Sequence, residues 1–325
     1  MNKNLDFGTF VISLDFELMW GMKDIATPDG YGQSHVANVP VVIDRLISLF
    51  EKYNVNATVA AVGLIFAKDP SEVSNFEPKD LPSYVNGDLS PYTDNYIQNI
   101  AHEHFNLYFA PDIINRLKEC PNIEVGTHTF CHYYCNEAGQ NATQFRQDLE
   151  SAKKIAKNFD IDLQSIIFPR NEVNAEYLNI CRELGVTTYR GNALKYFNSS
   201  SRLGNLRNRI CRLIDTYLPI NNSTTYDYDT LKEDGMVDIR ASRFLSPYSS
   251  LLSPFRRLQL SRISKEMTIA AQKHQLYHLW WHPHNFGADT DKNFIFLEEI
   301  LRHYTSCKNE YGMHSLSMTQ LSNLL

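Results

Sequence analysis

Two histidines four residues apart are the first candidates for chemistry in this chain. His128 and His132 follow an apolar run at residues 123–126. Residues at positions i and i+4 share one face of a helical turn, so both imidazoles could reach one metal ion. Far upstream, Asp15 and Glu17 end another apolar run and are two residues apart. Alternate residues of a strand point to the same face, so we expect these carboxylates to project together.

A third apolar run, residues 276–281, leads into His282, which is followed by Pro283 and His284. Each of the three runs has the length and composition of a strand and ends in a carboxylate or an imidazole. In barrels of parallel strands, catalytic residues collect where the strands end. The three runs together predict a metal-dependent hydrolase with its site at the carboxyl ends of barrel strands.

Length and composition restrict the class of protein. A chain of 325 residues is long enough for one large α/β domain, and its net charge of −6 argues against non-specific nucleic-acid binding. No apolar run is long enough to span a bilayer, and the first residues lack the pattern of a secretory signal. The six cysteines show no disulfide-scaffold spacing. These features predict a cytoplasmic protein without a membrane span, and they leave its oligomeric state open.

Strand and helix signals alternate along most of the chain. Strands are predicted at residues 9–14, 56–63, 123–126, 165–168, 186–189, 236–240 and 276–281. Helices are predicted at residues 39–53, 111–120, 141–159, 174–184, 203–218, 255–274 and 292–311. Asn38 is a candidate cap for the first helix, with Pro40 in its first turn. The alternation favours an α/β fold with parallel strands and crossover helices. We expect a single domain, residues 1–325, with insertions at about 64–110 and 192–253.

The order of these motifs resembles that of polysaccharide deacetylases, which form carbohydrate esterase family four and share the NodB homology fold. The resemblance is carried by residues 10–17, 57–63, 124–132, 165–170 and 281–283, and residues 124–132 are the most specific of these motifs. It implies a distorted (β/α) barrel of the polysaccharide-deacetylase type with an insertion in the C-terminal half. It also implies hydrolysis of an N-acyl group, most often N-acetyl, on an amino sugar with one divalent metal ion.

The resemblance also implies roles for individual residues. Glu17, His128 and His132 would hold the metal, and Zn²⁺ suits this ligand set best, although Co²⁺, Ni²⁺ or Mn²⁺ could also bind. Asp15 would be the general base, although the family commonly has two adjacent aspartates here and the two carboxylates could exchange roles. His282 would be the general acid.

An arginine is also expected to form an ion pair with the general base, Asp15. Arg170 would pair with Asp15, although the family usually places its arginine before the proline rather than after it, as Arg170 follows Pro169. Trp20, Trp281 and His284 are the candidates for substrate binding. The partner would be an N-acylated amino sugar, and the enzyme would act in surface-polysaccharide assembly.

Two alternative functions stay open, and a structural zinc site is disfavoured. The enzyme could hydrolyse another amide, such as an N-formyl sugar or a cyclic ureide. The protein could also be a catalytically silent relative that binds carbohydrate, although such a protein would not need the full set of candidate catalytic residues. A closed structural zinc site of His128, Cys131, His132 and Cys135 is disfavoured, because four ligands from two turns of one helix cannot easily surround an ion.

Overall fold

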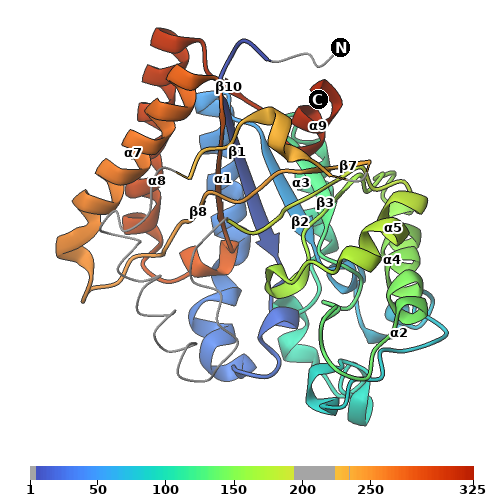
Figure 1. The fold of residues 1–325 in the computed structure, drawn as a ribbon. Helices are drawn as coiled ribbons and strands as arrows, with labels where there is room; N and C mark the ends of the chain where they lie inside the picture. The colour runs from blue at the N-terminus through green and yellow to red at the C-terminus, as the bar shows by residue number, and fades with distance from the viewer. Residues whose placement is uncertain (1–4, 194–223, 234) are drawn as a thin grey trace, which may run out of the picture.

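The fold is built on one curled, largely parallel β-sheet that is covered on its outer face by helices (Figure 1). The structure is a computed structural model, and it describes residues 5–193, 224–233 and 235–325. The strands are β1 (Thr9–Phe16), β2 (Ala57–Ala61), β3 (Ile123–Thr127), β4 (Ser165–Ile166), β5 (Thr188–Tyr189), β6 (Lys232–Glu233), β7 (Met236–Asp238), β8 (Arg243–Phe244), β9 (Leu276–Trp281) and β10 (His314–Ser315). Their order is β6-β7-β5-β4-β3-β2-β1-β9-β8, and β10 pairs with the start of β1.

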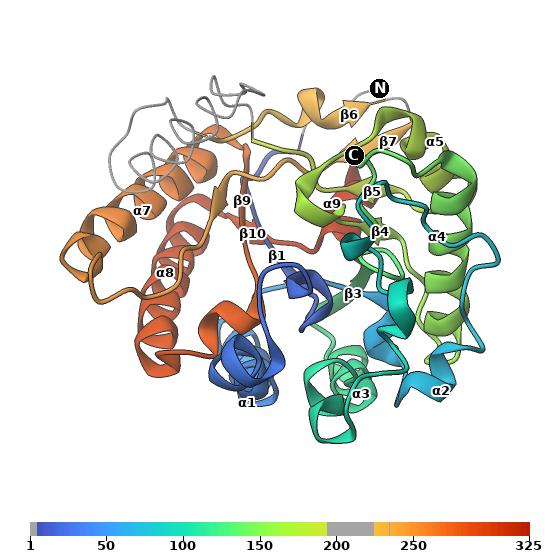
Figure 2. The same cartoon turned by 90° about the horizontal axis from the view of Figure 1, so that it is seen from below.

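The helices are α1 (Val39–Tyr53), α2 (Pro70–Val73), α3 (Pro111–Glu119), α4 (Ala142–Lys157), α5 (Ala175–Glu183), α7 (Arg256–Lys273), α8 (Thr290–Tyr311) and α9 (Met318–Leu324). Seen along the strands, α7, α8, α1, α3, α4 and α5 form an arc around the sheet (Figure 2). The predicted α/β fold, a distorted (β/α) barrel of the deacetylase type, is therefore confirmed as a curled half-barrel. Crossover connections put consecutive parallel strands side by side and leave their carboxyl ends at one end of the barrel.

The central strand β1 explains why the sheet is stable and where a site can form. All eight of its residues are buried, since one face packs on helices and the other lines the barrel interior. Ser13 and Asp15 alternate with Leu14 and Phe16, and Ser13 lies beside Trp280 of β9 in the parallel register. The polar residues of β1 therefore share the interior face with Trp280. The other face of the strand, with Phe10, Ile12, Leu14 and Phe16, is directed toward the surrounding helices.

Most element predictions are confirmed within a few residues, and α1 and β9 have the predicted bounds. Asn38 lies at the N-cap position of α1, as predicted, but its side chain does not bond to the helix. Asn38 already has right-handed helical dihedral angles, because the short turn Val36–Asn38 runs directly into the helix. Its side chain donates instead to the carbonyl of Gly287 at 3.0 Å. Pro40 does lie in the first turn of α1. The helix predicted at 203–218 lies outside the described residues.

Candidate metal centre and catalytic site

The two carboxylates at the end of β1 both reach the barrel interior. Asp15 is the penultimate residue of the strand and Glu17 is the first residue after it. They are 3% and 5% exposed, and both lie near His282. The backbone turns away at Leu18, which has a positive φ of 47°. Gly21 then passes so close to the Glu17 carboxylate that a Cβ at this position would collide with it. The predicted projection of both acids toward one side is therefore confirmed.

The loop after β3 carries His128 and His132, but it is not a helical turn. His128 directly follows the strand, and the chain then passes through positive φ at Thr129 (65°) and His132 (60°). The prediction that a helical i, i+4 spacing brings the rings together is wrong. A tight irregular loop does so instead, and the ring centroids lie 5.0 Å apart. The disfavoured zinc site that includes Cys131 and Cys135 is not formed, since neither thiol joins the group of possible ligands among the described residues.

Glu17, His128 and His132 form a buried group whose ligand atoms all lie within 4.8 Å of one another. His128 donates its Nδ1–H to the carbonyl of Ile167 at 2.8 Å, so in the neutral ring the Nε2 atom carries the lone pair. That lone pair faces the Oε2 atom of Glu17 at 3.5 Å, and the Nε2 atom has no hydrogen-bond partner. Two acceptors that face each other in a buried site repel, and a cation between them removes the repulsion.

The protonation states also fit a cation. His132 Nε2 lies 3.0 Å from the same Glu17 oxygen, and burial lowers the pKa of His132, so this ring is neutral near pH 7. Burial alone would raise the pKa of Glu17, but the nearby imidazoles of His282, His128 and His132 outweigh it and hold the pKa well below its usual range. Neutral imidazoles and an ionised carboxylate are the forms that bind a metal. The residues therefore fit a divalent cation with three protein ligands, a set typical of catalytic zinc sites.

Arg190, and not Arg170, holds Asp15. Its guanidinium donates to both Asp15 oxygens, from Nη1 to Oδ1 at 2.6 Å and from Nη2 to Oδ2 at 2.7 Å. Both groups are buried, and the pKa of Asp15 stays below its usual value because Arg190 and His282 outweigh the effect of burial. The predicted pair of Arg170 with Asp15 is wrong: Arg170 has a φ of 56° and pairs with Asp24 and Glu137 at the surface.

Sequence reasoning missed Arg190 and the groups that hold it. Arg190 Nε donates to Asn171 Oδ1 at 3.0 Å, and its Nη1 donates to Ser13 Oγ at 3.0 Å. Ser13 therefore has its own hydrogen free for His278 Nε2 at 2.8 Å, while His278 Nδ1–H donates to the carbonyl of Ile239. Burial and the charge of Arg190 lower the pKa of His278 to about 3, so this ring is neutral. A signal did exist, since Arg190 ends a predicted strand just as Asp15 does.

His282 lies beside both carboxylates. Its Nε2 is 3.6 Å from Asp15 Oδ2 and 3.5 Å from Glu17 Oε1. Asn285 Nδ2 lies 3.4 Å from His282 Nδ1, so Nε2 is the ring nitrogen that faces the carboxylates. With 22% of its side chain exposed, His282 is the most accessible of the predicted catalytic and metal-binding residues that meet here.

The predicted substrate-binding residues are buried. Trp20 is 4% exposed and donates its indole N–H to the carbonyl of Tyr108, and Trp281 is fully buried on the helix side of β9. Neither ring can stack on a sugar, so these two predictions are wrong. His284 is also buried, 3.9 Å from Glu17, and burial lowers its pKa to about 3. The half-buried Trp280 lies on the site face of β9 instead, with its ring over the Arg190 guanidinium at 4.2 Å.

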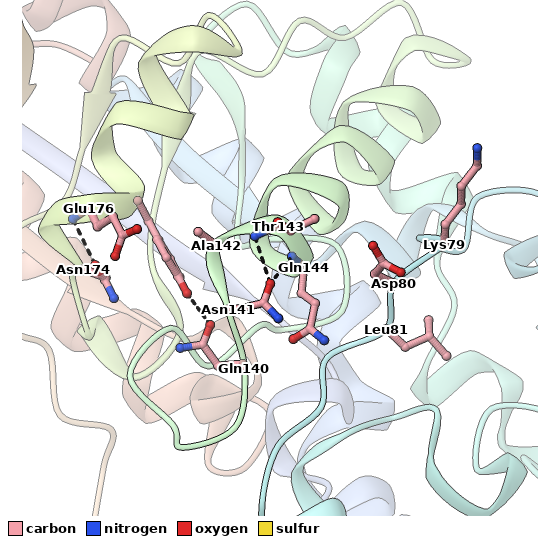
Figure 3. A pocket seen from close by; sticks show the side chains of 11 residues that line it. Lys79, Asp80, Leu81, Gln140, Asn141, Ala142, Thr143, Gln144, Asn174 and Glu176 are labelled. Carbon is pink, nitrogen blue, oxygen red and sulfur yellow. Dashed lines mark hydrogen bonds between the residues drawn. The ribbon is translucent and has the colours of Figure 1, made fainter.

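A large surface pocket lies elsewhere, at the N-terminal ends of α4 and α5 (Figure 3). It has a volume of about 970 Å³, and none of its lining residues belongs to the carboxylate and histidine group. Helix N-termini can bind anions through free N–H groups. Here Asn141 already accepts from the N–H groups of Thr143 and Gln144, and Asn174 accepts from that of Glu176. The pocket is therefore not a second candidate site.

Comparison with known proteins gives the family. The polysaccharide deacetylase family profile matches residues 29–189, a range that includes both metal-site histidines. Taken with the fold, this match places the chain in the NodB-type polysaccharide deacetylase superfamily. None of the described helices is long and apolar enough to cross a membrane.

Solved structures of low sequence identity share the fold. A protein of Mycobacterium smegmatis assigned to the polysaccharide deacetylases superposes with a TM-score of 0.59 and 13% identity, over 99% of this chain and 92% of that one. A second such protein, from Pseudomonas aeruginosa PAO1, gives 0.53 and 11%, over 98% and 91%. A GH57-type branching enzyme of Pyrococcus horikoshii gives 0.55 and 11%, over 97% and 70%.

One curated protein matches over a limited segment. The chain is 30% identical over 105 residues to tRNA pseudouridine synthase A of Methanocella arvoryzae. The match covers 32% of this chain and 39% of that synthase. Because it spans less than half of either protein, it assigns no function to this chain.

Proposed function

We propose that this protein is a metal-dependent deacetylase that removes an N-acyl group, N-acetyl in the first instance, from an amino sugar. One observation carries the proposal. Glu17, His128 and His132 converge on one point, beside an Asp15 that Arg190 keeps ionised and a His282 that faces both carboxylates. This arrangement provides separate groups for metal binding, proton acceptance and proton donation, which amide hydrolysis requires.

The surroundings of the two carboxylates support the division of roles. The Oε2 atom of Glu17 has the imidazoles of His128 and His132 within 3.5 Å, and no arginine of the described residues pairs with Glu17, so it is the metal ligand in this proposal. Asp15 is bound by a bidentate arginine and is the general base, which accepts a proton from the attacking water. A divalent cation bound by the three ligands would polarise the substrate carbonyl and lower the pKa of that water. Zn²⁺ suits the ligands best.

His282 would donate the proton to the departing amine. Its Nε2 atom faces both carboxylates, and the exposed part of its ring offers substrate a way to the site. Trp280, on the same face of β9, replaces Trp20 and Trp281 as the aromatic ring that can contact a sugar. The place in surface-polysaccharide assembly and the cytoplasmic location remain predictions.

The test measures metal content and amine release together. Purified protein is loaded with Zn²⁺ and incubated with N-acetylated amino sugars and their oligomers, with an N-formyl sugar and with a cyclic ureide. Free amine is then quantified, and a double substitution of His128 and His132 by alanine serves as the control. Release from acetylated sugars by the wild type alone supports the proposal. Release from the ureide alone would favour the alternative amidase, and stoichiometric metal without any turnover would favour a silent relative.

A further inference from the structure

A buried carboxylate on α4 lies behind the loop that carries the two metal-site histidines. Asp148 is 0% exposed. Its Oδ2 accepts the backbone N–H of Phe130 at 2.7 Å, and its Oδ1 accepts that of Cys131 at 3.1 Å. No ion pair of Asp148 is found within the described part of the chain. Both hydrogen bonds therefore go to the segment between His128 and His132.

Burial of a carboxylate at this position is energetically unfavourable. Burial raises the pKa of Asp148 to about 6, although hydrogen bonds from Cys131 and Phe130 oppose the shift. An apolar residue would fill the same space without a desolvation penalty. Other residues on the same face of α4, such as Leu149 and Ile155, are apolar and buried. The acid is thus not needed for packing, and its use must come from the N–H groups that it binds.

The bound loop is conformationally strained. Thr129 and His132 have positive φ, a region that is costly for any residue with a Cβ and more so for a β-branched one. Such residues persist only where their surroundings fix them, and they collect at functional sites. Thr129 Oγ1 donates to the carbonyl of His128 and accepts the N–H of Tyr133, but these bonds are internal to the loop. Asp148 ties the middle of the loop to a helix.

We propose that Asp148 is a positioning residue for the metal centre, which holds the loop of His128 and His132 in its strained conformation and so presets the distance between the two imidazoles. The inference rests on the proposed metal site and extends it to a residue that contacts neither metal nor substrate. Without the two hydrogen bonds, the loop relaxes toward negative φ and the rings move apart. Metal binding must then restore the strained conformation, which lowers the affinity.

The experiment compares Zn²⁺ affinity in variants of the full chain by competition with a chromophoric chelator. Asp148→Asn keeps the shape but turns one acceptor into an NH₂ donor that faces a backbone N–H. The expected loss of affinity is about 10–100-fold, as for other groups that support metal ligands. Ile155→Val, on the buried face of the same helix, is the matched control, because it lowers stability without a bond to the loop. Glu150→Gln removes an exposed carboxylate from α4 and controls for charge.

The outcomes separate the inference from the proposed function. A folded Asp148→Asn protein with weakened Zn²⁺ binding, beside controls that bind like the wild type, supports the inference. If Asp148→Asn binds Zn²⁺ as tightly as the wild type, the positioning role is refuted and the proposed metal site is unaffected. A wild type that binds neither Zn²⁺ nor Co²⁺ refutes the metal centre, and the inference with it. If Asp148→Asn does not fold, Asp148→Glu is tested instead. Its longer side chain keeps the charge but cannot accept from both N–H groups in the same geometry. Unchanged Zn²⁺ affinity in Asp148→Glu would then refute the positioning role.

Discussion

Replacement of Arg190 by methionine should destabilise the protein strongly, because it leaves Asp15 as an uncompensated buried charge. Methionine retains the apolar stem of arginine and removes both charge-assisted bonds to Asp15. Removal of one partner of a buried pair costs about 3–5 kcal/mol. For 325 residues the unfolding entropy near 60 °C is about 0.7 kcal/mol/K. The melting temperature should therefore fall by ~4–7 °C.

The sign of the pH dependence follows from the pKa of Asp15. In the wild type this pKa lies below the unfolded value of 3.8, so the pair stabilises the fold above that pH and the effect is lost as the pH falls through the folded pKa. Without Arg190 the effect of burial dominates and raises the pKa of Asp15. The charged form then destabilises the fold near pH 7, and protonation relieves this. The difference in stability between wild type and Arg190→Met should be largest at pH 7 and should narrow toward pH 4.

Arg170→Met is the matched control for this prediction. Its side chain is 36% exposed, and its partners Asp24 and Glu137 are also accessible to solvent. Exposed ion pairs contribute about 0–1 kcal/mol, so the melting temperature should change by ~1–2 °C at most. Thermal unfolding followed by circular dichroism from pH 4 to pH 8 tests both variants. Equal melting temperatures for Arg190→Met and wild type, or a larger fall in Arg170→Met, would refute the assignment of Arg190 as the partner of Asp15.

Other predictions concern the metal and the proton transfers. Asp15→Asn should keep stoichiometric Zn²⁺ and lose most turnover, whereas Glu17→Gln should lose Zn²⁺. Elemental analysis measures the metal content of both variants. The reverse pattern would make Asp15 the metal ligand and Glu17 the general base. His282→Ala should lower turnover by roughly 10²–10⁴-fold with metal content unchanged, the usual worth of general acid–base catalysis. His284→Ala should lower it clearly less, and equal losses would contradict the choice of His282 as the acid. Gly21→Ala should weaken Zn²⁺ binding, because its Cβ displaces the Glu17 carboxylate; unchanged affinity would show that the chain can shift there.

The longer strands could be predicted to within a few residues, because hydrophobic periodicity reports directly on burial. The two-residue strands β6, β8 and β10 were not predicted. Asp15, Glu17, His128 and His282 each lie at or directly after the end of a strand, and parallel topology brings such positions together. The local conformation of the loops could not be predicted in the same way. The positive φ angles at Thr129 and His132 depend on bonds to distant residues, which no pattern of neighbours along the chain reveals.

The error over Arg170 has the same physical origin. Arg170 and Arg190 are both close to the carboxyl end of a strand, and motif order alone favoured the arginine next to Pro169. What separates them is backbone direction: Arg170 has a φ of 56° and leads its side chain to the surface, while Arg190 continues from β5 into the interior. An arginine is stable in the interior only if its donors are satisfied. Ser13, Asp15 and Asn171 supply the acceptors, and they come from β1 and from the turn after β4. The choice between the two arginines therefore depends on three partners that are remote from Arg190 in the sequence, and only Asn171 adjoins Arg170.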